Sequence, residues 1–448
     1  MKNRIFLFIF LFILTGLFAL SYSQYAALKY DLHHPDPKRR IKAAKKIGEL
    51  RLREAVPDLI EASSDKNELV RKAVLESLIK IGDERAFDTY VKMVNDPSPE
   101  IRLRAIDGIV RSYVVDESGF IAGTKKVLKF LNPFDDDYDP LIVPPYVKVR
   151  KDALLTIAGR LQDNDLKVRK AAITSLGILR GDYVIDKMIE NFDWEKNSNL
   201  KIKYMQSFYK IGDKKVCPYL VRYIKFENKA IHDEAIMTCG YLKCVVAVDT
   251  LLDIYKSGIK ERKKLWGVIP ISASDDLKFK CYKALSLIGD KRAEDIFLSR
   301  LYDRLGKYRE TAAEGLARIA DPGTLPKLLE RRKRAMSREL QLALDFALFK
   351  LGKDAYLSDM VSEIGSFRYS DRVYGYILDF TPEEADKLFP FLNILNSVKA
   401  RKKLLFALAV VGSKKAIPVV KTWINSPDEE VSSAALYAYR CLKFKYGE

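Results

Sequence analysis

The sequence predicts an all-α protein in which about twelve helical hairpins stack into an α-solenoid. Three observations favour this fold: apolar residues recur with helical spacing, the pattern repeats about every 31 residues, and Gly-Asp or Asp-Pro pairs separate the helices. A single hairpin cannot bury its apolar stripe, whereas stacked hairpins share one continuous core. With 448 residues, 48% of them apolar and 31% charged, the chain can form such an array, and the composition argues against a disordered chain.

The segment 70–97 shows one complete unit. The apolar residues from Val70 to Ile81 fall on one face of a helix. Gly82 is expected to end this helix, because glycine tolerates the left-handed backbone that often follows a helix. A second apolar stripe covers residues 87–94, and Asn95-Asp96-Pro97 closes the unit. The segment therefore predicts a helical hairpin.

The first residues of this unit recur along the chain at intervals of mostly 31 or 32 residues. Three longer intervals of 67, 46 and 60 residues interrupt the series; two of them predict about two units each, and one predicts an insertion. The recurring pairs are Val70-Arg71, Ile101-Arg102, Val168-Arg169, Leu200-Lys201, Ile231-His232, Leu277-Lys278, Tyr308-Arg309, Leu340-Gln341, Ala400-Arg401 and Val431-Ser432. The helix-ending pair recurs as Gly82-Asp83, Gly181-Asp182, Gly212-Asp213 and Gly289-Asp290.

These units resemble the short HEAT repeats known as PBS-lyase HEAT-like repeats. The resemblance rests on the Asp-Pro turn followed by Ile101-Arg102 and on the segment 165–172 followed by Leu176-Gly177. It covers nearly the whole of residues 36–448, is strongest in the first half, and is weakest near Arg372. The resemblance implies a right-handed superhelix of helical hairpins.

The resemblance also implies a structural role for the Asp and Arg residues of the repeat. An Asp before a helix caps free backbone N–H groups, and in HEAT arrays the Arg pairs with an Asp of a neighbouring repeat to form a ladder. We therefore expect the Asp and Arg residues of the repeat to stabilise the scaffold. We also expect the ladder to be interrupted where Lys201, His232, Lys278 and Gln341 replace the Arg. The predicted ladder and cap residues are Asp65, Arg71, Asp96, Arg102, Asp165 and Arg169.

Residues 1–23 have the three parts of a secretory signal peptide. Lys2 and Arg4 precede an apolar run from Ile5 to Leu20, and small residues precede Gln24. The run is shorter than the about 20 residues that a membrane-spanning helix needs. Cleavage and export to the periplasm or cell envelope are therefore expected, with an uncleaved inner-membrane anchor as the alternative. Residues 24–35 would lead into the repeats.

The five cysteines do not form a disulfide framework by their spacing. All five fall within helical patterns, where buried free thiols are expected, although Cys239 and Cys244 could pair across a turn. The others are Cys217, Cys281 and Cys441.

The net charge of +18 favours anionic partners, such as an acidic protein or a phospholipid surface.

Two insertions interrupt the array, near 112–146 and 256–276, and insertions in repeat arrays often carry function. The first contains the aspartates of segment 135–139, which could bind Ca²⁺ but match no EF-hand spacing, so an acidic solvated turn is favoured. The second places Lys263 and Lys264 beside Trp266, a combination that suits a partner-binding hot spot or a membrane contact, or a Trp that folds back onto the array.

A basic cluster between two helices is the other candidate partner site. It comprises Arg331, Arg332 and Arg334, and it could bind an acidic partner or remain a solvated connector. Nucleic-acid binding is disfavoured because export is expected.

The sequence contains no recognisable catalytic, cofactor-binding or metal-binding motif. The three histidines, His33, His34 and His232, have no companions at metal-ligand spacing, and no Gly-rich phosphate-binding loop is present. We therefore expect a scaffold for protein–protein interaction in the cell envelope, and no enzyme. The alternatives are a membrane-anchored adaptor that contacts anionic lipid and, as the family name suggests, a lyase-like subunit.

Overall fold

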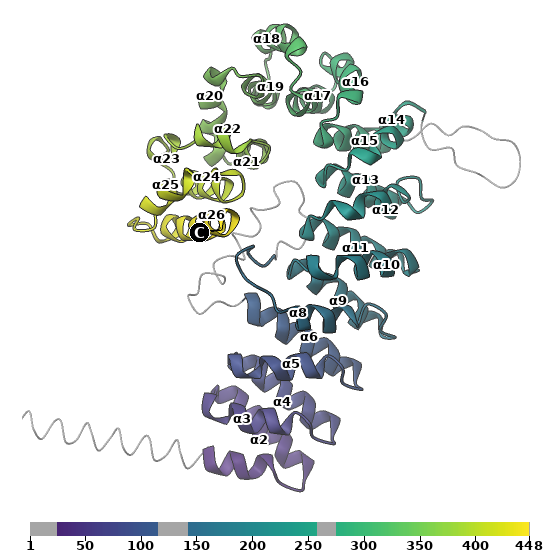
Figure 1. The fold of residues 1–448 in the computed structure, drawn as a ribbon, viewed down its shortest axis with the longest axis vertical. Helices are drawn as coiled ribbons and strands as arrows, with labels where there is room; N and C mark the ends of the chain where they lie inside the picture. The colour runs from purple at the N-terminus through teal and green to yellow at the C-terminus, as the bar shows by residue number, and fades with distance from the viewer. Residues whose placement is uncertain (1–24, 115–141, 258–274, 448) are drawn as a thin grey trace, which may run out of the picture. The chain divides into compact units, whose positions relative to one another are not determined.

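The computed structural model describes residues 25–114, 142–257 and 275–447 (Figure 1). Within these ranges the regular structure is helical, which confirms the prediction of an all-α solenoid. Residues 25–32 are helical and precede the first hairpin. Among the described residues, no helix is both long enough and apolar enough to cross a bilayer.

The chain divides into two compact units. Unit 1 consists of residues 1–116 and 149–179, and unit 2 of residues 117–148 and 180–448. The helices of unit 1 are α2 (Pro37–Leu50), α3 (Val56–Ala62), α4 (Glu68–Ile81), α5 (Phe87–Met93), α6 (Pro99–Val114), α8 (Lys151–Ala158) and α9 (Leu166–Ile178).

Unit 2 contains the remaining helices. They are α10 (Ile185–Trp194), α11 (Ser198–Ile211), α12 (Cys217–Val221), α13 (Lys229–Tyr241), α14 (Val248–Ser257), α15 (Asp275–Ile288), α16 (Glu294–Arg300), α17 (Gly306–Ile319), α18 (Leu325–Lys333), α19 (Arg338–Lys350), α20 (Leu357–Ser362), α21 (Ser370–Ile377), α22 (Pro382–Asp386), α23 (Phe391–Ile394), α24 (Val398–Val411), α25 (Ala416–Thr422) and α26 (Glu429–Tyr446).

In unit 1 the first helices of successive hairpins stack on one another, in the order α2, α4, α6 and α9. Helix α8 packs against α5 and α9, so it takes the place of the second helix that follows α6. The 67-residue interval therefore holds one hairpin among the described residues, with an insertion between its two helices. Only the end of this insertion is described, and there Tyr146, part of unit 2, packs edge-on against Tyr437 of α26.

In unit 2 the first helices lie on the inner side of a curve and the second helices on the outer side (Figure 1). The closest packing accordingly joins first helices, such as α13 with α15, α17 with α19, and α24 with α26. Helices α19 and α24 are buried around most of their circumference, as their apolar sequences require.

Unit 2 also contains contacts between hairpins that are not neighbours. Asp379, just after α21, accepts hydrogen bonds from Lys243 Nζ at 2.6 Å and from Arg318 Nε at 2.7 Å. We call these three residues the clasp. In addition, Arg372 of α21 pairs with Glu310 of α17 at 3.0 Å. A regular solenoid has contacts between adjacent repeats only, so unit 2 is more tightly closed than the repeat pattern predicts.

The helix ends follow the predicted chemistry with one exception. Gly82, Gly212 and Gly289 have left-handed backbones, with φ values of 68°, 80° and 71°. Gly181 does not, because Arg180 takes the left-handed conformation at φ 52°, one residue earlier.

The expected cysteine chemistry is partly wrong. Cys244 forms a disulfide with Cys217 and not with Cys239, and the bond joins the first residue of α12 to the turn that follows α13. Cys239, Cys281 and Cys441 are buried free thiols. Burial raises the pKa of the Cys239 thiol to about 12, so this side chain is an unreactive core residue.

Candidate functional site

The ladder of unit 1 consists of buried ion pairs between successive hairpins. Arg71 Nε and Nη2 donate to the two carboxylate oxygens of Asp96 at 2.8 and 2.9 Å, and Arg40 binds Asp65 in the same two-pronged manner. The next rung joins Arg102 Nη2 to Asp163 at 2.7 Å. Paired guanidinium and carboxylate groups with this geometry fix the register of one hairpin on the next.

The aspartates of the ladder and the helix caps are separate residues. Asp163 pairs with the ladder Arg, whereas Asp165 caps α9 by accepting hydrogen bonds from the backbone N–H groups of Lys167 and Val168. At the turn before α4, Asp65 pairs with Arg40, and Asn67 caps α4. Arg169 donates to the backbone carbonyl of Asp163 at 2.7 Å, which closes the turn before its own helix.

In most repeats, the residue at the position of the ladder Arg also closes the turn before its own helix. Arg71 Nη1 donates to the carbonyl of Asp65, and Arg309 to that of Asp303. Where the Arg is replaced, His232 Nδ1 lies 3.2 Å from the carbonyl of Phe226, and Gln341 donates to that of Ala335. The replacements therefore keep the turn-closing contact within the repeat, whereas the ion pair to the next repeat requires the Arg.

Lys201 occupies the ladder position in an aromatic environment. Its Nζ donates to the carbonyl of Phe192 and to the hydroxyl of Tyr223, both at 2.7 Å, and lies over both rings. Burial lowers the pKa of Lys201, and nearby acidic residues only partly oppose that shift. The side chain is a structural element of the core and is not available to a partner.

The predicted basic cluster divides into internal and exposed residues. Arg332 pairs with the fully buried carboxylate of Asp345 at 2.6 Å. Arg331 donates to the carbonyl of Leu301 at 3.0 Å. Arg334 is the exposed member, paired loosely with Glu330 on its own helix. Arg334 is therefore the member of the cluster that remains exposed to solvent. Trp266, Lys263 and Lys264 lie outside the described residues.

The structure exposes a second surface, which sequence reasoning missed. Trp194 ends α10 and is 78% exposed, and Phe226 on the next inter-hairpin turn is 41% exposed. Arg222 bridges the two turns by pairing with Asp193 at 3.0 Å. We call Trp194, Arg222 and Phe226 the Trp194 surface. The signal in the sequence was a large aromatic at the inter-hairpin turn, where the hairpins of unit 1 carry polar residues.

One aromatic side chain of the Trp194 surface, Phe226, stands on a packed aromatic base. Phe226 packs on Tyr223 with ring centroids 5.4 Å apart, and Tyr223 packs on the buried Phe192 at 4.8 Å. Exposed residues of both charge signs, including Lys225 and Glu227, surround Phe226. Aromatic and Arg anchors inside a mixed polar rim are typical of protein–protein hot spots.

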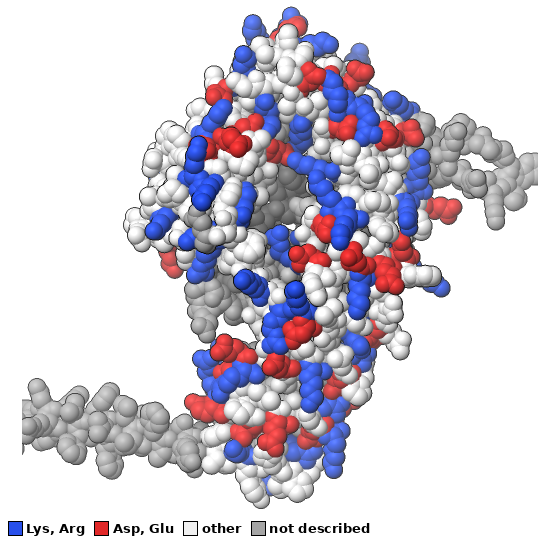
Figure 2. Space-filling view, viewed as in Figure 1, with Lys and Arg blue, Asp and Glu red and all other residues white. Residues whose placement is uncertain are grey.

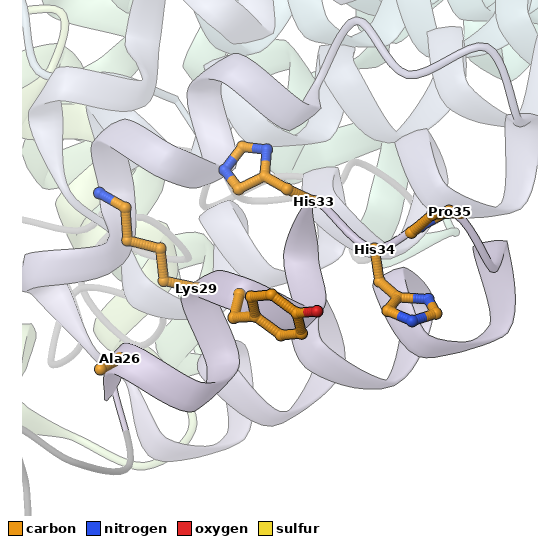
Figure 3. Close-up of a pocket in the computed structure, with 6 residues that line it drawn as sticks. Ala26, Lys29, His33, His34 and Pro35 are labelled. Carbon is orange, nitrogen blue, oxygen red and sulfur yellow. The ribbon is translucent and has the colours of Figure 1, made fainter.

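A shallow pocket of about 380 Å³ lies at the N-terminal end of unit 1, lined in part by Lys29, Tyr30, His33 and His34 (Figure 3). The imidazoles of His33 and His34 lie apart and do not converge on one point (Figure 3). His34 Nδ1 accepts a hydrogen bond from the backbone of Asp36 at 3.0 Å. In the described part of the chain, no group of three or more His, Cys, Asp or Glu residues could hold a metal ion.

Comparisons with known proteins agree with this architecture. Residues 26–139 match the family model for HEAT repeats, which confirms the resemblance over this range. The search of curated proteins found no match.

Several solved structures align with most of this chain at low identity. An engineered protein is 13% identical, with 94% of this chain and 99% of that chain covered and a TM-score of 0.37. Importin beta is 12% identical, with 93% and 62% covered and a TM-score of 0.42. Kap95p, which binds RanGDP, is 13% identical, with 94% and 61% covered and a TM-score of 0.43. At these identities and TM-scores the likeness carries no conclusion about this chain.

Proposed function

We propose that this array of HEAT-type hairpins is an exported scaffold that holds a protein partner in the cell envelope and does not catalyse a reaction. The observation that carries the proposal is the Trp194 surface. Its two aromatic side chains are exposed on adjacent turns, and Phe226 is supported by a packed aromatic core. Because Phe226 is held by these rings, a partner can bury it with little loss of conformational entropy, and Trp194 adds a large aromatic contact surface beside it.

Export is supported by two independent features. Residues 1–23 have the pattern of a signal peptide, and the Cys217–Cys244 disulfide suits an oxidising compartment such as the periplasm. The net charge of +18 favours a partner with an acidic surface.

The partner proposal is tested by a photo-crosslinking amino acid placed at Trp194 or, as a control, at Tyr183. Tyr183 is also an exposed aromatic of unit 2 but lies on the turn between α9 and α10. In intact cells, position 194 should crosslink to a discrete envelope protein, and Phe226→Ala should reduce the yield. Equal crosslinking at both positions would show that the Trp194 surface is not the binding site.

Export is tested by mass spectrometry of the chain recovered from fractionated cells. A chain that begins near Gln24 in the periplasmic fraction is expected. A chain that begins at Met1 in the membrane fraction would support the anchored alternative, and one in the cytoplasm would contradict export altogether.

A further inference from the structure

Three successive inter-hairpin turns of unit 2 carry apolar side chains that point into solvent. Met336 is 96% and Phe367 100% exposed, and Tyr302 and Leu305 on the preceding turn are more than half exposed. We call the apolar residues Tyr302, Leu305, Met336 and Phe367, together with the cations Arg304, Lys307, Lys333, Arg334 and Arg368 on the same turns, the basic rim. No member of this set belongs to the Trp194 surface.

Side-chain contacts hold the three turns next to one another. Arg331, at the end of α18, donates to the carbonyl of Leu301 and lies over the ring of Tyr302 at 5.4 Å. Arg338 on the second turn pairs with Glu363 at 3.0 Å, and Arg368 on the third turn pairs with Glu339 at 2.6 Å. The basic rim is therefore one continuous edge of unit 2.

The exposed side chains cannot fold back into the protein. Each turn also contributes a residue to the core: Leu301 and Ile364 are fully buried, and Ala335 is nearly so. These inward residues fix the turns, so Met336 and Phe367 remain directed outward. Their exposure is a consequence of the fold and not of a mobile loop.

The charge on the basic rim is unbalanced. The carboxylates on these turns are already paired: Asp303 with Arg300 at 2.5 Å, Glu363 with Arg338, and Glu339 with the rim residue Arg368. In contrast, Arg304, Lys307 and Lys333 are exposed and have no ion pair among the described residues. Figure 2 shows basic side chains at the top of the view, where Figure 1 places α18.

We propose that the basic rim docks this protein on an anionic lipid surface, with Met336 and Phe367 entering the interfacial region of the bilayer. Apolar and aromatic side chains enter that region readily, and adjacent Lys and Arg side chains contact acidic headgroups. This inference goes beyond the protein-binding function proposed above, because it adds a second type of partner on a separate surface.

The exposure pattern favours a bilayer over a protein as the occupant. Protein hot spots lie in a patch whose surrounding residues exclude water from a shared centre. On the Trp194 surface, Arg222 joins the two aromatic turns and the neighbours carry both charge signs, whereas the apolar residues of the basic rim are interleaved with cations that form no ion pair in the described part of the chain. A bilayer accepts such separate projections because it needs no matching shape, and the uncompensated cations complement its negative surface.

The test places an environment-sensitive fluorophore on the full-length chain, purified as cells process it. The label is attached at Met336→Cys or, as a control, at Val246→Cys, an exposed apolar residue on the turn after α13. The three native free thiols are buried and should not react. Vesicles of equal parts phosphatidylglycerol and phosphatidylcholine should shift the emission at position 336 to the blue, whereas phosphatidylcholine vesicles should not. Position 246 should not respond to either.

Charge variants test the electrostatic part in the same labelled protein. Arg304→Gln with Lys333→Gln should weaken binding to the phosphatidylglycerol vesicles roughly twenty-five-fold, because each cation near an anionic surface contributes a factor of about five. Lys353→Gln, an exposed cation on the turn between α19 and α20, is the matched control and should bind like the parent.

Three results would overturn the proposal. They are no emission shift at position 336 with anionic vesicles, an equal shift at positions 336 and 246, or unchanged affinity in the double charge variant. A crosslinker at position 336 that captures a protein in cells, together with no vesicle binding, would assign the basic rim to a protein partner instead. An uncleaved anchor would insert into both kinds of vesicle, so the phosphatidylcholine vesicles and the label at position 246 distinguish it from docking by the basic rim.

Discussion

At the scale of single residues, one position in each repeat serves two functions. Its side chain closes the turn before its own helix, and at Arg40, Arg71 and Arg102 it also reaches the Asp of the next hairpin. Arg71, for example, binds the carbonyl of Asp65 and the carboxylate of Asp96. Gln341 and His232 are long enough for the first contact only. The ladder can therefore end in the middle of the chain while the repeat itself continues.

The ladder predicts a large effect for one substitution in unit 1. Arg71→Ala leaves the buried carboxylate of Asp96 without its partner, so the free energy of unfolding should fall by about 3–5 kcal/mol. Arg111→Ala is the control, since Arg111 forms an exposed pair with Asp107 on the same helix and its loss should cost less than about 0.5 kcal/mol. Chemical denaturation followed by circular dichroism measures both; equal losses would contradict the role of the ladder.

The ladder also predicts a dependence on pH. Burial opposes ionisation of Asp163, but Arg102 and the backbone N–H of Asp165 more than compensate and hold its pKa below the usual value. The folded state therefore binds protons less readily than the unfolded state. The contribution of Asp163 to the free energy of unfolding is fully present above the unfolded aspartate pKa of about 3.9, and it is lost as the pH falls from there through the lower pKa of the folded state. In Asp163→Asn, the decline of the unfolding free energy between neutral and acidic pH should be smaller. An unchanged pH profile would show that Asp163 does not contribute to the pH dependence of the unfolding free energy.

At the scale of the helices, first helices approach one another closely because small residues meet at their crossings. A Cβ added to Gly48 of α2 would lie 2.8 Å from the backbone of Ser77 in α4, and the Ser77 hydroxyl donates to the carbonyl of Ala44 at 2.7 Å. Neighbouring hairpins are thus joined by backbone-to-side-chain contacts in addition to apolar packing.

The disulfide adds a covalent link between two hairpins, α11–α12 and α13–α14. It closes a loop with a sequence separation of 27 residues, so its loss should lower the free energy of unfolding by about 3 kcal/mol. Cys217→Ser with Cys244→Ser should show this loss, whereas Cys441→Ala should leave the disulfide intact in non-reducing mass spectrometry. Two free thiols at Cys217 and Cys244 in protein taken from the native compartment would contradict the assignment.

The helical pattern was predictable from the sequence because helix periodicity and turn residues are local signals. Pairing between hairpins was not. Cys239 and Cys244 are close in sequence, yet Cys244 lies on a turn next to the preceding hairpin, where it meets Cys217. Likewise, both Asp163 and Asp165 precede α9, and only the position of Arg102 in the neighbouring hairpin decides which of them forms the ladder.

At the scale of the whole molecule, the clasp distinguishes unit 2 from a simple solenoid. Burial would raise the pKa of Asp379, but Arg318 and Lys243 hold it below its usual value, so this carboxylate is charged in the fold. Asp379→Asn leaves the buried Arg318 without its counter-ion and should destabilise unit 2 by about 3–5 kcal/mol. Hydrogen exchange should show faster opening in unit 2 and unchanged protection in α2–α6. Uniform loss across both units would show that they do not unfold independently.

The candidate sites were less predictable than the fold. Arg331 and Arg332 look like solvated cations in the sequence, but their acceptors, the carbonyl of Leu301 and the carboxylate of Asp345, lie on other elements. Met336 and Phe367 look like ordinary core residues, because nothing local distinguishes an outward turn position from an inward one. Exposure is a property of the assembled array.

The clasp has a consequence for how this protein could change in length. Unit 1 resembles a chain of interchangeable modules, since each of its rungs joins one hairpin to the next. A duplicated hairpin there could be accommodated by one more rung. Within unit 2, an extra hairpin between Lys243 and Asp379 would shift the two halves of the clasp out of alignment. The stretch between Lys243 and Asp379 should therefore keep a fixed number of hairpins, whereas the array before Leu179 can grow or shrink.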